Sequence, residues 1–294
     1  VAAFDHRDIF IDPDPDMAAS FAERKRLFAL PRSSWQDYNK KLLSKGGMII
    51  SRAEKSVTLT PEAAGVIGLD KTVATPFDIM NAILKAPVDL LWFGGIGTYI
   101  KAPDEADAEV GDRANDAIRV TGGEVRAKVI GEGANLGVTQ KGRIAYALSG
   151  GRLNSDAIDN SAGVNSSDVE VNIKIALAPA LADKRLSRDK RDKLLSDMTD
   201  EVAALVLRNN YLQTLAISLT ERKGNVNREE LGRLMTYLEE LGRLNRKVEV
   251  LPDNATLADR YAAGKGLTRP EIGVLLSYAK LVLFDQLIDS DLPD

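Results

Sequence analysis

Apolar residues in the first part of the chain come in short runs that alternate with segments of helical spacing. The runs predict strands at residues 1–4, 47–50, 88–92, 127–130 and 156–158. Residues 105–119 and 140–149 have helical patterns, and the second pattern stops at Gly150-Gly151. Strands separated by helices indicate an α/β domain, with helices on both faces of a parallel sheet.

Two helix starts are marked by a hydroxyl residue followed by proline. Thr60-Pro61 and Thr75-Pro76 each place an N-cap side chain before a proline at the first helical position. Both signals lie in the first part of the chain, where they help to separate the helices from the strands.

From about residue 176 the pattern changes to long amphipathic segments, at 187–207, 209–223, 227–247 and 268–289. The last segment starts with Thr268 and has Glu271 three residues later, which predicts a capping box. Its apolar stripe consists of Ile272, Leu275, Leu276, Ala279, Leu283 and Leu287. We therefore predict two domains: a partial Rossmann-like dinucleotide-binding domain over residues 1–175 and an all-α domain over residues 176–294.

Composition and charge narrow the functional classes. Hydrophobic residues make up 44% and charged residues 28%, as in ordinary globular proteins. The net charge of −4 does not show the excess of basic residues that is typical of nucleic-acid-binding proteins. No apolar run approaches the ~20 residues of a membrane span. The absence of cysteine excludes disulfides and thiol chemistry, and it fits the reducing cytoplasm, where we expect the protein.

The chain starts within an apolar run and without methionine, which indicates a fragment of a longer protein. The single histidine, His6, leaves little room for a histidine-based triad or a multi-histidine metal site. We expect no metal.

The first candidate binding residue is Asp5, directly after the first predicted strand. This strand would correspond to the second strand of a dinucleotide fold. An acid at the end of that strand can accept hydrogen bonds from the adenosine ribose, and it repels the 2′-phosphate of NADP. The alternative is an aspartate that caps a tight turn. Arg7 complicates the preference for NAD, since an arginine can bind a 2′-phosphate.

A second candidate is the glycine-rich segment from Gly94, which follows the predicted strand 88–92. Glycines there let the backbone approach a ligand at the carboxyl end of a strand, where open α/β sheets have their binding crevice. The spacing is not that of the phosphate-binding fingerprint, and a plain glycine-rich turn explains it equally well.

A third candidate comprises Asn135 and Asn160, each close after a predicted strand, and Ser167 further along. An asparagine has both a donor and an acceptor, which match a nicotinamide carboxamide or a ribose hydroxyl. A serine at the start of a helix can bind a carboxylate with help from backbone N–H groups. Spacing alone favours two polar turns in which each asparagine binds its own backbone.

The amino-acid sequences of these segments resemble those of a known protein family. Glu132-Gly133-Ala134-Asn135, with Asn160-Ser161-Ala162-Gly163-Val164, Ser167 and Glu170 downstream, is similar to the cofactor domain of glutamate dehydrogenases. Residues 3–13, 29–35, 85–92 and 111–116 resemble the large, NAD-specific bacterial subfamily. The resemblance extends over essentially the whole chain, including the helical part.

The resemblance implies oxidative deamination of L-glutamate to 2-oxoglutarate and ammonia, with NAD as the hydride acceptor. It also implies a role for each candidate. Asp5 would hold the adenosine ribose, Gly94 and Gly95 would line the adenosine side, Asn135 would contact the nicotinamide ribose, Asn160 would hold the carboxamide, and Ser167 would bind the side-chain carboxylate of the substrate. Helices of this kind also lead us to expect a homo-oligomer, although plain packing would explain them as well.

Several family features are missing or altered. Ser161 and Ala162 replace an alanine and a glycine of the family's motif. The first strand of the family's cofactor domain, its glycine-rich pyrophosphate turn and its catalytic lysine and aspartate are not found, and Lys45 and Lys128 suit solvated or structural roles better. We therefore assign no catalytic residue to the chain and expect it to be inactive alone. A dehydrogenase of an apolar amino acid and a non-catalytic assembly module are the alternatives.

Overall fold

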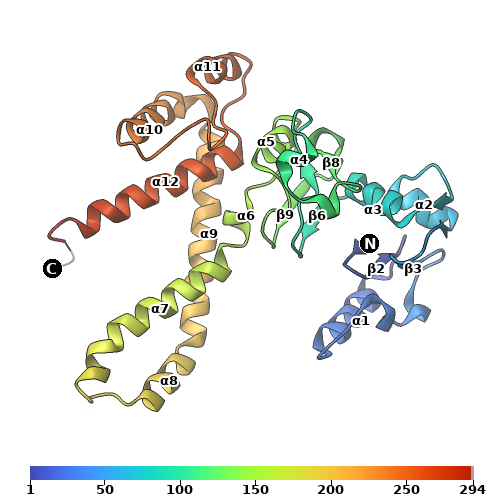
Figure 1. The fold of residues 1–294 in the computed structure, drawn as a ribbon, viewed down its shortest axis with the longest axis horizontal. Helices are drawn as coiled ribbons and strands as arrows, with labels where there is room; N and C mark the ends of the chain where they lie inside the picture. Colours follow the sequence, from blue (N-terminus) through green and yellow to red (C-terminus); the bar gives the residue numbers. More distant parts are fainter. Residues whose placement is uncertain (293–294) are drawn as a thin grey trace. The chain divides into compact units, whose positions relative to one another are not determined.

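The computed structural model describes residues 1–292 (Figure 1), which form two compact units. The first unit comprises Val1–Ile130 and Gly137–Gly151, and the second comprises Gly131–Leu136 and the residues from Arg152 onward. The predicted boundary at residue 175 falls inside helix α7 (Ser161–Ala182), and the division into folding domains stays a prediction.

The first unit has several small sheets. In the largest, β1 (Ala2–Phe4), β2 (Asp8–Ile11) and β3 (Met48–Ser51) pair antiparallel in that order. The two-stranded sheets are β4 (Val57–Thr58) with β5 (Val73–Ala74), β6 (Leu90–Phe93) with β9 (Val129–Glu132), and β7 (Ile100–Lys101) with β8 (Val120–Thr121).

The mixed α/β character of this part is confirmed, but residues 1–292 contain no single parallel sheet of the kind that we predicted. The reason is visible at the first strand. A turn of a few residues joins β1 directly to β2, and such a short connection can link only antiparallel strands. The pattern predicted β1 but missed β2, so it could not reveal the hairpin.

The helices of the first unit are α1 (Met17–Ala29), α2 (Pro61–Ile67), α3 (Pro76–Lys85), α4 (Asp107–Val110) and α5 (Gln140–Leu148). Both predicted caps are confirmed: the hydroxyls of Thr60 and Thr75 accept backbone N–H bonds at the starts of α2 and α3. The predicted helix at 105–119 is wrong, because α4 ends at Gly111, which has a φ of 76°, and a 3-10 turn follows.

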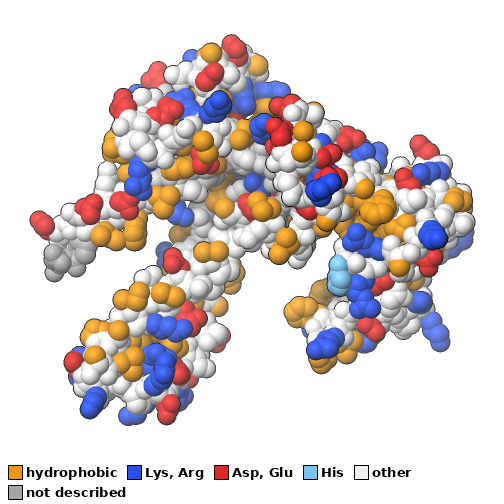
Figure 2. Space-filling view, viewed as in Figure 1, with side chains coloured by type: hydrophobic (Ala, Val, Ile, Leu, Met, Phe, Trp, Pro, Cys, Tyr) orange, Lys and Arg blue, Asp and Glu red, His pale blue; other side chains and the backbone are white. Residues whose placement is uncertain are grey.

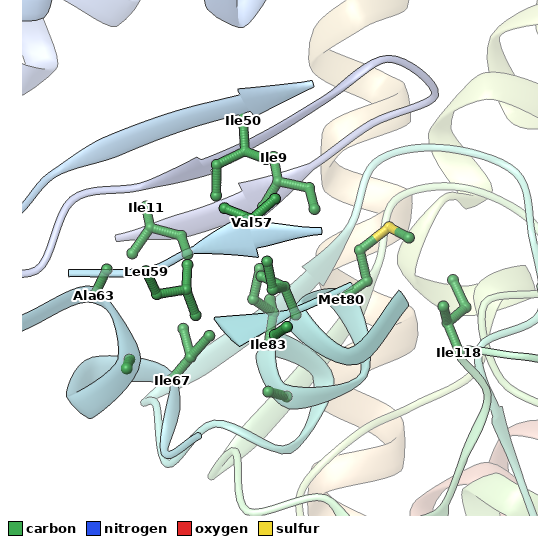
Figure 3. Close-up of a cluster of buried hydrophobic side chains, with 14 residues drawn as sticks. Ile9, Ile11, Ile50, Val57, Leu59, Ala63, Ile67, Met80, Ile83 and Ile118 are labelled. Carbon is green, nitrogen blue, oxygen red and sulfur yellow. The ribbon is translucent and has the colours of Figure 1, made fainter. Parts of the chain in front are cut away.

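A hydrophobic core lies between the three-stranded sheet and the helices α2 and α3. Figure 3 shows Ile9, Ile11 and Ile50 from the sheet, with side chains from β4, α2 and α3 beside them. Ile9, Ile11 and Ile79 are fully buried. At about 25 cal/mol per Å² of apolar surface, each such side chain contributes roughly 1.5–3 kcal/mol to folding. This core holds the β1–β2 hairpin, which carries Asp5.

The described part of the second unit is helical apart from the end of β9. Its helices are α6 (Asp156–Asp159), α7, α8 (Arg188–Asp197), α9 (Thr199–Lys223), α10 (Arg228–Glu240), α11 (Asn254–Ala262) and α12 (Arg269–Ile288). Helix α7 packs against α9 near the start of α7, and α8 lies between them in the chain (Figure 1). The predicted strand at 156–158 is wrong: these residues belong to a single helical turn, and three residues are too few for periodicity to separate strand from helix.

The core of the second unit is formed by α9, α10, α11 and α12, with Ile217, Met235 and Leu238 almost fully buried. The predicted capping box of α12 is confirmed, since Glu271 accepts the backbone N–H of Thr268 at 2.6 Å. The apolar stripe of α12 is buried only near its start, and Leu283 remains 55% exposed.

None of the helices in residues 1–292 is both long and apolar enough to cross a lipid bilayer. On the face drawn in Figure 2, basic and acidic side chains are interspersed.

Candidate functional site

Asp5 lies in the hairpin turn between β1 and β2 and is half-buried. Its Oδ1 accepts the backbone N–H groups of Arg7 at 2.7 Å and Asp8 at 2.8 Å, so it forms an Asx turn. The other oxygen, Oδ2, accepts no hydrogen bond within residues 1–292, and Arg52 donates to the Asp5 carbonyl at 2.7 Å. The turn role is therefore present, and one carboxylate oxygen is left for a ligand.

Gly94 and Gly95 follow β6 and are exposed. A Cβ at Gly95 would meet no atom within 4 Å, and one at Gly94 would meet only the Trp92 ring, at 3.4 Å. Backbone without side chains therefore faces open space at the carboxyl end of β6. The conformational requirement lies further on, at Gly97, whose φ of +144° and close contact with Tyr99 exclude a side chain.

Tyr99 links the two strand ends that carry these candidates. Its ring packs on Phe4, which precedes Asp5, at 5.7 Å between centroids, and on Phe93, which precedes Gly94, at 5.6 Å. Burial raises the pKa of Tyr99, so the phenol stays neutral. The pattern gave no signal for Tyr99 or Arg52, because aromatic contacts between strand ends depend on the fold.

The loop after Gly97 is fixed by buried polar contacts. Asp112 accepts the Thr98 N–H at 2.8 Å, and Arg119 donates to the Thr98 carbonyl at 2.9 Å. Burial acts to raise the pKa of Asp112, but hydrogen bonds from Asn115 and Thr98 lower it overall. The carboxylate therefore stays charged at neutral pH and holds the loop in place.

The second unit brings two predicted residues into direct contact. Asn160, at the junction of α6 and α7, donates from Nδ2 to Oδ1 of Asn135 at 2.6 Å. Within residues 1–292 the Asn160 Oδ1 and the Asn135 Nδ2 have no partner, and the Asn135 side chain is exposed. The pair therefore presents one acceptor and one donor to solvent, as recognition of a carboxamide or a hydroxyl requires.

The segment Gly131–Leu136, the Asn135 loop, is held at both ends by carboxylates. Asp159 accepts the N–H of Glu132 at 3.0 Å, and Asp156 accepts the N–H of Leu136 at 2.9 Å. Asp156 comes from the segment that we predicted to be a strand, and Asp159 follows that segment directly. Their side chains can hold the two ends of this loop because the segment forms the helical turn α6 and not a strand.

Ser167 lies elsewhere on α7 than we predicted. The helix starts at Ser161, so Ser167 is in its second turn and its backbone N–H is not a free terminal donor. The expected contribution of the helix N-terminus to carboxylate binding at Ser167 is therefore wrong, because that effect is confined to the first turn. The side chain is exposed, and residues 1–292 offer its hydroxyl no hydrogen bond.

Ser161, which departs from the family motif, has a packing role. Its hydroxyl accepts from Asn210 at 2.9 Å and from Gln213 at 3.3 Å, both on α9. These bonds fix the start of α7, next to Asn160, against α9.

The two lysines that we considered are both paired. Lys45 binds Glu62 at 2.8 Å and Lys128 binds Asp89 at 2.7 Å, and these hydrogen bonds raise the pKa of each lysine. A general base requires a lowered lysine pKa, so neither geometry suits that role. Residues 1–292 also contain no cluster of three or more acidic or histidine side chains that could hold a metal ion.

Comparison with protein families gives two matches along the chain. Residues 1–220 match the model described as bacterial NAD-glutamate dehydrogenase, catalytic domain, and residues 264–294 match the model described as glutamate dehydrogenase, C-terminal. The chain therefore belongs to the bacterial NAD-glutamate dehydrogenase family.

Three similar proteins carry the name NAD-specific glutamate dehydrogenase. The chain is 52% identical to the protein of Pseudomonas aeruginosa, 50% to that of Halomonas elongata and 49% to that of Mycobacterium tuberculosis. Each match covers 100% of the chain but only 18% of the relative, so the chain spans less than a fifth of the length of these proteins.

Proposed function

We propose that the chain contributes part of the cofactor site, and one substrate contact, to an enzyme that oxidises L-glutamate to 2-oxoglutarate and ammonia with NAD. The observation that carries the proposal is the Asn135–Asn160 pair, two amides 25 residues apart that meet at 2.6 Å. When bound, NAD accepts the hydride from the α-carbon of the substrate. We assign the nicotinamide ribose to Asn135 and the carboxamide to Asn160.

The open groups of the pair fit the nicotinamide end of the cofactor. A primary carboxamide has one carbonyl and one NH₂, and a ribose hydroxyl both donates and accepts. The free Asn160 Oδ1 would accept from the carboxamide, and the free Asn135 Nδ2 would donate to the ribose. Holding the carboxamide limits rotation of the ring and thereby orients the reacting face.

The adenosine end is assigned to Asp5, Gly94 and Gly95. The open Oδ2 of Asp5 fits a ribose hydroxyl, and the bare backbone at Gly95 lets a flat ligand approach closely. In this proposal residues 1–175 form part of a Rossmann-like domain that is completed by sequence outside this chain. The pyrophosphate turn and the acid/base residues would come from the same source, so the 294-residue chain alone is expected to be inactive.

For the substrate, we keep Ser167 as the candidate for the side-chain carboxylate of glutamate. Ser167 is seven residues after Asn160, the N-cap residue of α7, and seven residues make almost two turns, so Ser167 lies on the side of α7 that continues from Asn160. An exposed hydroxyl without a partner is available to a ligand. A homo-oligomer in the cytoplasm completes the proposal.

The test uses the full-length protein that carries this sequence. Glutamate-dependent NADH formation is measured for the parent, for Asn160→Ala and for a matched control, Asn165→Ala. Asn165 is also on α7 and accepts from another asparagine, Asn209, at 3.1 Å.

We expect Asn160→Ala to lower kcat by roughly 100-fold with little change in NAD affinity, since small misplacements of reacting groups have effects of this order. Asn165→Ala should leave both unchanged. Equal effects of the two substitutions would contradict the assignment. Absence of glutamate oxidation by the parent would contradict the function and favour the alternatives, a non-catalytic module or a dehydrogenase of an apolar amino acid.

A further inference from the structure

A chain of side-chain hydrogen bonds joins α12 to the Asn135 loop. Arg269, the first residue of α12, donates from Nε to Oδ1 of Asn154 at 3.0 Å. Asn154 donates from Nδ2 to Oδ1 of Asp159 at 2.7 Å, and the Glu132 N–H donates to Oδ2 of Asp159 at 3.0 Å. Three side chains therefore connect residue 269 to residue 132.

The polarity of this chain is fixed from both ends. Arg269 and the Glu132 N–H can only donate, so the two side chains between them must accept at their outer ends. Asp159 satisfies this by accepting twice. An asparagine at 159 could accept from Glu132 only by turning an NH₂ group toward Asn154, which would then have to turn its own NH₂ toward Arg269. Whichever way the asparagine side chain at position 159 is turned, two N–H donors would face each other at one step of the chain.

Arg269 is itself firmly held, which makes it an anchor. It is buried, and its Nη1 donates to Glu221 at 2.7 Å and to Ser218 at 3.1 Å, both on α9. One guanidinium thus binds α9 and Asn154 together, a geometry that the single nitrogen of lysine cannot reproduce.

The Asn135 loop needs such an anchor because it ends in an unfavourable conformation. Leu136 has a φ of 62°, in the left-handed region, although it carries a branched side chain that is 61% exposed. Packing of that side chain therefore contributes little to holding the conformation, and the bond from its N–H to Asp156 does so directly. Asp156 and Asp159 fix the loop from either end, with Asn135 between them.

We propose that Asp159 is a positioning residue for the nicotinamide side of the site, and that the Arg269–Asn154–Asp159 chain makes the orientation of Asn135 depend on α12. This inference rests on the proposed function of Asn135 and Asn160. It assigns a role in catalysis to helix α12, whose first residue lies more than 130 residues after Asn135 in the sequence.

The test compares Asp159→Asn, Asn154→Ala and Arg269→Gln in the full-length protein with the control Asn209→Ala, which removes a bond between α9 and α7 away from the loop. The measurements are kcat, KM for NAD and for glutamate, the primary isotope effect with 2-deuterated glutamate, and the melting temperature. Asn154→Ala breaks the chain without touching α12, so the test remains decisive if Arg269→Gln does not fold.

We expect Asp159→Asn to lower kcat about 10-fold, with an unchanged or larger isotope effect and an unchanged KM for glutamate, because a misplaced nicotinamide slows hydride transfer. Asn154→Ala should act in the same direction, and its combination with Asp159→Asn should cost no more than Asp159→Asn alone. Asn209→Ala should change only the melting temperature.

The inference is overturned if Asp159→Asn and Asn154→Ala lower the melting temperature as the control does and leave kcat unchanged. Asn135→Ala and Asn160→Ala are measured in the same series. If these two lower kcat while Asp159→Asn does not, only the positioning role fails. If Asn135→Ala and Asn160→Ala also leave kcat unchanged, the proposed cofactor site itself is wrong.

Discussion

Replacing Asp5 separates its role in the turn from its proposed role in cofactor binding. Asp5→Asn keeps an Oδ1 that can accept from Arg7 and Asp8, so the Asx turn and the melting temperature should be retained. It replaces Oδ2, the only open oxygen, with an NH₂ group. Asp5→Ala removes both functions and should also destabilise the hairpin by about 1 kcal/mol, the usual net value of such hydrogen bonds.

The size of the binding effect follows from the same geometry. With Oδ1 already occupied by the turn, Asp5 has one oxygen for the ribose and cannot bind two hydroxyls bidentately. One hydrogen bond to a charged group contributes roughly 1.5–3 kcal/mol, and the new NH₂ can still donate to a ribose oxygen, so the lower end applies. Asp5→Asn should therefore weaken NAD binding about 10-fold.

Loss of the charge should also narrow the discrimination against NADP, because the repulsion of its 2′-phosphate disappears while the exposed Arg7 remains. The assay is titration of the full-length protein with NAD and with NADP, alongside thermal unfolding. Unchanged NAD affinity in both Asp5→Asn and Asp5→Ala, with a lower melting temperature in Asp5→Ala alone, would show that Asp5 serves only the turn.

Three further outcomes are expected in the full-length protein. Ser167→Ala should raise KM for glutamate and 2-oxoglutarate by ~10-fold at unchanged melting temperature, since its exposed hydroxyl stabilises nothing in residues 1–292; unchanged KM values would remove it from the substrate site. Arg119→Met should destabilise the protein by about 1.5–3 kcal/mol in urea unfolding, because its buried guanidinium donates charge-assisted hydrogen bonds to the partly exposed Asp107 at 2.8 Å and Asp116 at 2.6 Å; a loss below about 1 kcal/mol would contradict this. The hydrogen bond from Arg26 lowers the pKa of Glu23 from 4.5 to about 2. The stabilising effect of this pair is therefore complete above pH 4.5 and is lost as the pH falls toward 2. Glu23→Gln should reduce the change in unfolding free energy over this pH range, and an unaltered pH dependence would refute the pairing.

The features of the fold that could be predicted are those with local causes. The caps at Thr60 and Thr75 depend only on a hydroxyl side chain and the backbone a few residues ahead, and the bond from the Thr268 N–H to Glu271 spans only three residues; all three are confirmed. The strand pairing could not be predicted in the same way. Whether β1 joins a parallel sheet or a hairpin depends on β2, a four-residue strand that is completely buried and therefore lacks the alternation of a half-buried strand.

The candidate site shows the same division. Asparagine in two separate turns has no local signature of a contact, and only the resemblance to glutamate dehydrogenases suggested that Asn135 and Asn160 act together. The start of α7 was misplaced because Asn160 follows α6 without a break that the sequence marks. That error moved Ser167 to a helix end where it does not lie, and it hid the part that Asp156 and Asp159 play.

The two ends of the proposed cofactor site are built by different kinds of interaction, and they should respond differently to substitution. At the adenosine end, Asp5 is fixed by two backbone groups within three residues, so its geometry forms with the hairpin. At the nicotinamide end, Asn135 lies in a loop whose conformation is held by carboxylates from α6 and, through them, by α12. Changes far along the chain can therefore disturb the orientation of the nicotinamide without altering any residue that touches it, whereas comparable changes should leave the contact with the adenosine ribose intact.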